Sequence, residues 1–126
     1  MDLHDDGLLD LVFVTSTGGG GLALLPGLGN GVFGTTQLLS LSSEPIDVAA
    51  GDLNGDGVVD LAAVDSRLFA AQVSVLLGLG DGGLGPVQPF AVVGKTFVLG
   101  DVDGDSDLDI VSSSYSKYSL MLNQSQ

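Results

Sequence analysis

Residues 52–60 read D-L-N-G-D-G-V-V-D, and this nine-residue pattern occurs three times in the chain. It stands at residues 2–10 as D-L-H-D-D-G-L-L-D and at residues 101–109 as D-V-D-G-D-S-D-L-D. The three copies begin 50 and 49 residues apart, and a Leu or Ile follows each of them. A fixed period of this length is the signature of a repeat architecture, in which each unit is one small supersecondary structure.

Each repeat has the same order of apolar runs and turns. An apolar run precedes the Asp loop at 46–50 and 96–99, and another follows each loop. Further along come V-S-V-L-L-type runs and Gly-rich turns, with 22–31 matching 73–82 in phase. Short apolar runs between such turns predict strands, and four strands in ~50 residues is the pattern of a β-propeller blade.

The sequence therefore predicts an all-β chain of β-propeller blades. We expect about two and a half four-stranded antiparallel blades, with units at 1–43, 44–93 and 94–126, the first and last incomplete. Incomplete units leave open sheet edges, which favours a fragment of a longer propeller, with assembly of several chains as the alternative. A two-sheet sandwich could present similar strands but would not require an in-phase repeat.

One apolar run also predicts where its strand lies in the fold. Residues 11–14 read L-V-F-V and are apolar at every position, where a half-exposed strand would alternate. We therefore expect this strand to be a middle strand with both faces covered.

The Asp loops have the composition of calcium sites. In the second loop, Asp52, Asn54, Asp56 and Asp60 place oxygen-bearing side chains at positions 1, 3, 5 and 9, and Val58 offers its carbonyl at position 7. Calcium takes six to eight hard oxygen ligands, and a tight loop with oxygens at alternate positions can wrap one ion. Turn formation alone would also select Asp, Asn and Gly, but three in-phase copies favour calcium, with up to three ions.

The other two loops offer related sets of ligands. The third loop supplies the side chains of Asp101, Asp103, Asp105 and Asp109 with the carbonyl of Asp107, and the first supplies Asp2, His4, Asp6 and Asp10 with the carbonyl of Leu8. Ser106 replaces the turn glycine of the third loop, so we expect backbone strain there. His4 suits a hard cation poorly. It is expected to lie beside the ion more readily than to bind it, and the first site to be the weakest.

Other metal sites fit less well. An EF-hand loop begins in the same way but runs twelve residues to a bidentate Glu between two helices. Position 12 here is Phe13, Ala63 or Ser112, and strands are expected on both sides. Zinc prefers Cys and His, and the chain has no Cys and one His. Magnesium demands a stricter octahedral geometry.

The net charge of the chain limits the classes of partner that it can bind. The chain has 16 acidic residues against 3 basic ones, and twelve of the acids fall in the three loops. This balance argues against nucleic acid and anionic membranes as partners and in favour of cations. No run approaches the ~18 apolar residues of a membrane span. The first residues are acidic where a signal peptide is basic, so an export signal would lie outside this chain.

These motifs resemble the FG-GAP or VCBS repeats of integrin α-subunit propellers and of many secreted or surface proteins of microbes. The resemblance rests on the three loops and on the turns G-N-G-V-F-G (29–34) and G-D-G-G-L-G (80–85). The Phe-Gly motif for which the family is named is only partly present, since Phe33-Gly34 is followed by Thr35-Thr36 in place of Gly-Ala-Pro. The resemblance implies a propeller, usually of seven blades, with calcium in the loop that joins the first two strands of a blade. It also implies an extracellular or cell-surface location.

A catalytic role finds little support in the residues. The single histidine lies inside a metal loop and there is no Ser/His/Asp constellation, so we expect a structural or recognition module, binding a protein or glycan in an adhesion-like role, and not an enzyme. The alternative is an accessory region of a calcium-dependent hydrolase or lyase. Four aromatic residues could stack on a ligand, although each also suits packing between blades: Phe69, Phe90, Tyr115 and Tyr118.

Overall fold

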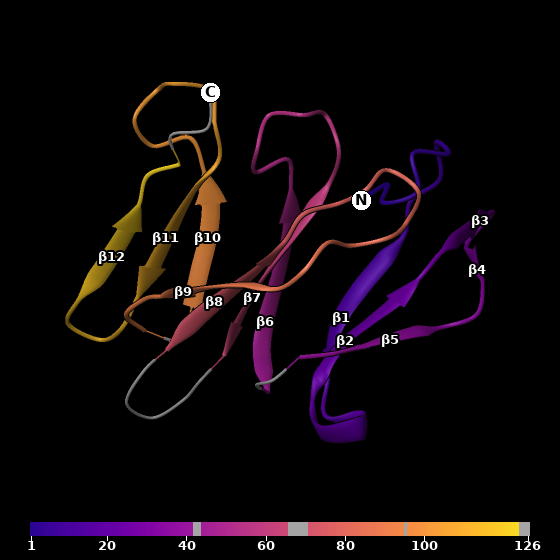
Figure 1. The fold of residues 1–126 in the computed structure, drawn as a ribbon, viewed down its shortest axis with the longest axis horizontal. Coiled ribbons are helices and arrows are strands. Elements are labelled where there is room, and N and C mark those ends of the chain that lie inside the picture. The colour runs from indigo at the N-terminus through magenta and orange to yellow at the C-terminus, as the bar shows by residue number, and fades with distance from the viewer. Residues whose placement is uncertain (42–43, 66–70, 95, 124–126) are drawn as a thin grey trace.

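The structure, a computed structural model, describes residues 1–41, 44–65, 71–94 and 96–123. Over these residues the chain is all-β apart from one short 3-10 turn at Thr17–Gly19, and its main sheets are small and antiparallel. The sheets stand side by side in chain order (Figure 1). No helix among the described residues is long and apolar enough to cross a membrane. The expectation of an all-β chain of blade-like sheets is confirmed.

The middle sheet is a complete four-stranded unit. It contains β6 (Pro45–Gly51), β7 (Asp60–Asp65), β8 (Gln72–Leu76) and β9 (Gln88–Ala91), hydrogen-bonded in sequence order. Every neighbouring pair is antiparallel. The sequence predicted this order from its apolar runs, and the second Asp loop joins β6 to β7, the first two strands.

The outer two sheets each have three strands. The first contains β1 (Leu11–Thr15), β2 (Gly21–Leu25) and β5 (Gln37–Ser40), and the third contains β10 (Thr96–Gly100), β11 (Asp109–Ser113) and β12 (Tyr118–Met121). The sequence did not predict the separate small hairpin of β3 (Gly27–Gly29) and β4 (Val32–Phe33), which forms within a stretch interpreted as a turn. Two positive-φ residues at its tip, Asn30 and Gly31, allow the tight reversal.

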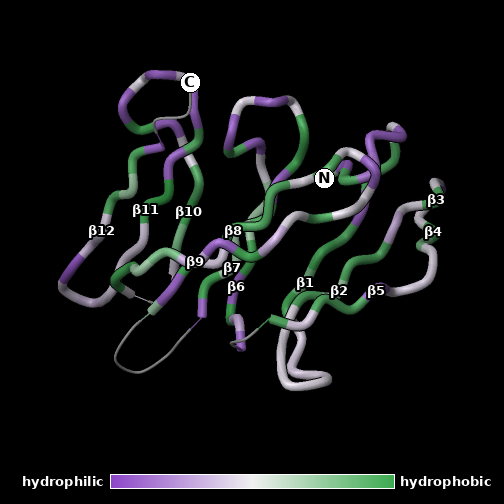
Figure 2. The backbone as a smooth tube through the Cα atoms, in the orientation of Figure 1, coloured by the Kyte–Doolittle hydropathy of each residue, from purple (hydrophilic) through white to green (hydrophobic). Residues whose placement is uncertain are grey.

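The core lies between neighbouring sheets. Between the first and second sheets it includes Leu3, Leu22, Leu61 and Leu76, and between the second and third it includes Leu53, Val64, Val73, Phe97 and Ile110. Strand β7 is buried at all six positions because it lies between both neighbours. Figure 2 shows hydrophobic residues along the strands where the sheets face one another.

The expectation that the strand at 11–14 is covered on both faces is wrong. Leu11 and Phe13 are each 47% exposed, while Val12 and Val14 contact the core between the first and second sheets. Their equivalents on β7, Leu61 and Ala63, face the first sheet and are buried. The apolar pattern thus marks a strand suited to two neighbours, and among the described residues β1 has a neighbouring sheet on one side only.

Candidate metal centre

The three Asp loops lie along the same edge of the row of sheets (Figure 1) and share one backbone conformation. Each has positive φ at positions 4 and 6, at Asp5 and Gly7, Gly55 and Gly57, and Gly104 and Ser106. These positive φ angles turn backbone N–H groups toward the inside of the loop. The side chain at position 1 accepts hydrogen bonds from these groups. Asp52, for example, accepts from Gly55, Asp56 and Gly57 at 2.8, 3.2 and 2.8 Å.

Asp2 and Asp101 do the same in their own loops. Asp2 accepts from Asp6 and Gly7 at 3.1 and 2.8 Å, and Asp101 accepts from Gly104 and Ser106 at 2.6 and 3.0 Å. The carboxylate at position 1 therefore organises each loop from inside.

Positions 3 and 5 also point back into the loop. Each position 5 carboxylate accepts the backbone N–H of position 7, in the pairs Asp6 with Leu8 (2.9 Å), Asp56 with Val58 (2.8 Å) and Asp105 with Asp107 (3.0 Å). At position 3, Asn54 and Asp103 each accept the N–H of position 5 at 3.2 Å. The side chains predicted as ligands at positions 1, 3 and 5 thus belong to one turn in the second and third loops, and those at positions 1 and 5 do so in the first.

Position 9 has a structural role that the sequence reasoning missed. Asp60 is fully buried, and its two oxygens accept the N–H groups of Leu53 at 2.8 Å and Gly78 at 2.7 Å. It therefore ties the start of its loop to the segment that leaves the third strand of its sheet. Asp10 bridges Leu3 and Gly27 in the same way, and Asp109 bridges Val102 and Asn123.

Burial makes the charged form of Asp60 less favourable. Desolvation raises the pKa of its carboxyl, and the charges of Asp56 and Asp52 add to that rise, while the N–H groups of Gly78 and Leu53 oppose it. A carboxylate has room for about four hydrogen bonds or ligands. Asp60 can thus hold both backbone groups and still face a cation, whose charge would relieve the cost.

The third loop brings its acids closest together. Among the described His, Asp and Glu side chains, Asp101, Asp103 and Asp109 form the one group of three whose candidate ligand atoms all lie within 4.8 Å of one another. The pKa of Asp103 is raised by partial desolvation and by the charges of Asp105 and Asp109, against the opposing N–H of Asp105. Like charges held this close are unfavourable without a cation, so the donor set fits a hard divalent ion.

His4 contacts an acid of its own loop. Its Nδ1 lies 3.0 Å from Oδ2 of Asp10. Burial acts to raise the pKa of Asp10, but the hydrogen bonds from His4, Gly27 and Leu3 outweigh it and lower that pKa. Asp10 and Asp60 are equivalent residues with opposite pKa shifts: the His4 contact lowers the pKa of Asp10, whereas the charges of Asp56 and Asp52 add to the rise in the pKa of Asp60. His4 is therefore placed as a partner of a candidate ligand.

Ser106 occupies a strained position, as the sequence predicted. Its φ is +77°, in the left-handed region, where the equivalent Gly7 and Gly57 have φ of 81° and 83°. A side chain there costs roughly 1–2 kcal/mol, partly offset by the greater chain entropy that glycine loses on folding.

We predict that Ser106→Gly raises the free energy of unfolding by about 1 kcal/mol, because the strain is removed and the N–H to Asp101 is kept. Chemical denaturation measures the change. The matched control is Gly57→Ser, which places the same strain in the second loop and should lower stability by a similar amount. A destabilising Ser106→Gly would contradict the strain.

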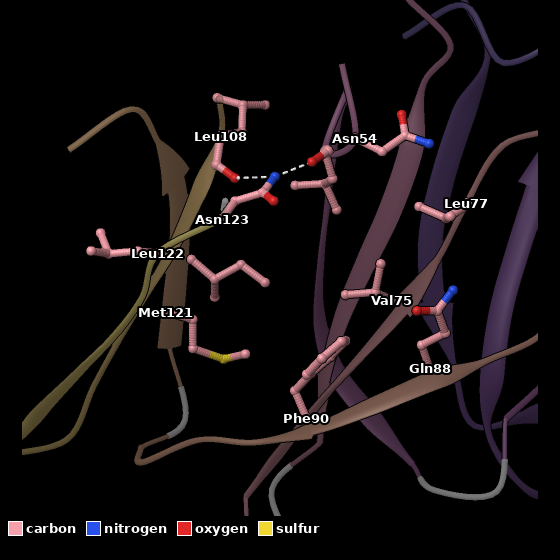
Figure 3. A pocket seen from close by; sticks show the side chains of 11 residues that line it. Asn54, Val75, Leu77, Gln88, Phe90, Leu108, Met121, Leu122 and Asn123 are labelled. Atoms are coloured by element: carbon pink, nitrogen blue, oxygen red, sulfur yellow. Dashed lines mark hydrogen bonds between the residues drawn. The ribbon is translucent and has the colours of Figure 1, made fainter. Parts of the chain in front are cut away.

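A pocket of about 280 Å³ opens between the second and third sheets beside the second loop. Figure 3 shows Phe90 and Val75 on one side and Met121 on the other, and the Asn123 amide closing one end. Nδ2 of Asn123 donates to the carbonyls of Leu53 and Leu108. Asn123 thus joins two Asp loops, a contact that the sequence reasoning missed.

The predicted aromatic residues are dispersed. Phe90 lines the pocket, whereas Tyr115 is fully exposed and Tyr118 is 78% exposed, so neither tyrosine is core. Phe69 lies outside the described residues.

These observations define a class of repeat protein, with small antiparallel sheets in a row and one Asp-rich loop between the first two strands of a unit. Residues 2–63 match the family model described as FG-GAP-like repeat. This segment, which spans the first two Asp loops, belongs to that family, and the resemblance deduced from the motifs is confirmed. No curated protein and no solved structure matched the chain.

Proposed function

We propose that the chain is a calcium-binding propeller module with a structural or recognition role, and not a catalyst. One observation carries the proposal: three loops fold the same way around oxygen donors at positions 1 and 5, with a buried Asp at position 9, and the second and third loops add an oxygen donor at position 3. The oxygen donor set, free of sulfur, is the chemistry that calcium prefers. The third loop, with Asp101, Asp103 and Asp109 already converging, is the leading site.

Calcium would bind three ligand sets of unequal quality. The proposed ligands in the second loop are Asp52, Asn54, Asp56, Asp60 and the Val58 carbonyl; in the third they are Asp101, Asp103, Asp105, Asp109 and the Asp107 carbonyl. The first loop offers Asp2, Asp6, Asp10 and the Leu8 carbonyl, with His4 beside them. It has the smallest set of oxygen ligands, and we expect it to be the weakest site.

The role of the ion would be to hold the sheets in place. Each position 9 carboxylate ties its loop to the segment after the second strand that follows the loop, so a cation that neutralises the loop would stabilise the unit as a whole. Binding of a protein or glycan is proposed on the exposed loops and on the Phe90 pocket. The FG-GAP-like repeat also motivates an extracellular or cell-surface location, where calcium is plentiful enough for sites of ~10⁻⁴–10⁻³ M affinity.

Calcium is expected to raise the melting temperature of the full chain, and chelation to lower it, because the ion binds the folded state. At a concentration about 100 times the dissociation constant, each site adds ~2.7 kcal/mol. The measurement is thermal unfolding followed by circular dichroism, in chelator and across a calcium titration. Magnesium at equal ionic strength is the control for screening and should give a much smaller shift. Equal melting temperatures in chelator and in saturating calcium would defeat the proposal.

A further inference from the structure

The carbonyl at position 2 of an Asp loop accepts a hydrogen bond from the following unit. In the first loop, the Leu3 carbonyl accepts the N–H of Gly82 at 3.2 Å. In the second loop, the Leu53 carbonyl accepts a hydrogen bond from Nδ2 of Asn123. A backbone donor and a side-chain donor thus reach the same acceptor position, so this is the point at which one Asp loop is held by the next unit.

The segment that supplies each donor is also bound to the Asp loop of its own unit. Gly78, four residues before Gly82, donates its N–H to Asp60 at 2.7 Å. Asn123 donates its N–H to Asp109 at 2.7 Å. In the third unit one residue therefore makes both contacts: its N–H is bound to position 9 of the third loop, and its side chain is bound to position 2 of the second.

Asn123 contacts the peptide groups that precede one proposed ligand in each of the two loops. Its Nδ2 donates at 3.2 Å to the carbonyl of Leu108, the residue before Asp109. The same nitrogen donates to the carbonyl of Leu53, the residue before Asn54 (Figure 3). Because the peptide group is planar, a fixed carbonyl also fixes the position of the next Cα. Asn123 is therefore a positioning residue for two loops, and it is not itself one of the proposed ligands.

Leu53 is held at both ends of its main chain. Its N–H donates to Asp60 of its own loop at 2.8 Å, and its carbonyl accepts the Asn123 amide. Leu53 is 7% exposed, and a buried polar group that loses its partner is costly. A movement of the third unit that withdraws the amide would therefore also disturb the second loop.

We propose that Asn123 couples the second and third loops, so that a calcium ion in either loop raises the calcium affinity of the other. The coupling rests on the proposed function, because it presupposes that both loops bind calcium. An ion held by Asp109 would restrict the backbone of Asn123 and, through the amide, the peptide between Leu53 and Asn54. Ordering a segment costs conformational entropy, and a segment that the first ion has ordered need not be ordered again by the second.

The effect of charge has to be separated from this contact, because the two loops are neighbours. A Cβ at Gly55 would lie 3.8 Å from Oδ1 of Asp107. A double variant, Asp103→Asn with Asp105→Asn, disables the third loop and keeps the acceptor oxygens that these side chains offer to the backbone. It removes two negative charges, which balances the two positive charges of the missing ion. The net charge of the third loop thus equals that of the calcium-loaded wild type.

The test is a calcium titration of the full chain followed by NMR. In the second loop, the N–H of Gly57 donates to Asp52. In the third, the N–H of Ser106 donates to Asp101. Both acceptors are proposed ligands, so the two resonances report the two sites separately. We expect the second loop to bind calcium at least about fivefold more tightly in the wild type than in the double variant.

Replacement of Asn123 tests whether its amide carries the coupling. Asn123→Ala removes the amide and keeps the N–H that Asp109 accepts, so the ratio of the two affinities should fall to about one. Asn123→Leu also lacks the donor but preserves the side-chain volume, which limits the loss of packing. A purely structural role would lower stability and leave the ratio unchanged. The matched control is Gln37→Ala, at an exposed amide on β5, which should keep the wild-type ratio.

Three outcomes would contradict these expectations. Equal calcium affinity of the second loop in the wild type and in the double variant would overturn the coupling alone, since the wild-type resonances would still show calcium binding. A ratio that persists in both Asn123→Ala and Asn123→Leu would also overturn it, because the coupling would then use another contact. If neither resonance of the wild type responds to calcium, the proposed function is wrong, and the coupling with it.

Discussion

Replacing Asp60 by Ala is expected to lower the free energy of unfolding by about 4 kcal/mol, because two buried N–H groups lose a charged acceptor at once. Each unsatisfied buried donor costs roughly 1–3 kcal/mol, and Leu53 and Gly78 would both be left without one. The loss is a large share of the ~5–15 kcal/mol that stabilises an ordinary domain. Urea denaturation in chelator measures it without any contribution from calcium.

Asp60→Asn separates the hydrogen bonds from the charge. The amide keeps one acceptor oxygen but turns an NH₂ group toward the second N–H, so we expect a loss of about 2 kcal/mol. Both substitutions remove the charge whose desolvation raises the pKa of Asp60, so the acceptor oxygen that the amide keeps is what makes Asn less costly than Ala. The matched control is Asp47→Asn, an exposed acid on β6, expected to change stability by less than about 0.5 kcal/mol. Equal stability of Asp60→Ala and the wild type would refute the bridging role.

The second large effect is a change in stability on replacing Asp103 that has opposite signs in chelator and in calcium. In chelator, Asp103→Asn should stabilise the fold, because it removes a charge that Asp105 and Asp109 repel. In calcium the same variant should be less stable than the wild type, because the leading site loses a carboxylate ligand. Even partners one shell beyond a metal change its affinity about 10- to 100-fold, so we expect at least a tenfold weaker calcium affinity. Calorimetric titration and thermal unfolding in both conditions measure the two effects.

The second loop provides the reciprocal control. Asn54 is the counterpart of Asp103, and Asn54→Asp gives the second loop the same acidic pattern. It should bind calcium more tightly and be less stable in chelator, so the two variants should move in opposite directions in each condition. A change of the same sign for Asp103→Asn with and without calcium would show that Asp103 is not a ligand.

The order of strands in the middle sheet was predictable because local signals fix it. Apolar runs separated by Gly-rich turns define β6 to β9, and an in-phase period of about 50 residues places the second and third Asp loops between the first two strands of their units. The strain at Ser106 was predictable for the same reason, since a turn that needs glycine in its equivalents penalises any Cβ.

Contacts between distant segments were not predictable in this way. The bridge from Asp60 to Gly78, the link from Asn123 to the second loop, and the exposure of Leu11 and Phe13 all depend on what the neighbouring segment or sheet places there. The apolar pattern of a strand predicts which of its faces can be buried. It does not predict whether a neighbouring sheet covers those faces.

By itself the sequence determined the kind of unit and the residues of the candidate calcium loops, because turn residues and acid spacing act within about ten residues of one another, and it showed the repeats through their period of about 50 residues. Only the tertiary structure decided which acids converge, which carboxylates are buried as bridges, and which apolar faces remain open. Those properties arise where strands far apart in the chain meet, and their energies depend on distance and exclusion of water, neither of which is encoded in local spacing.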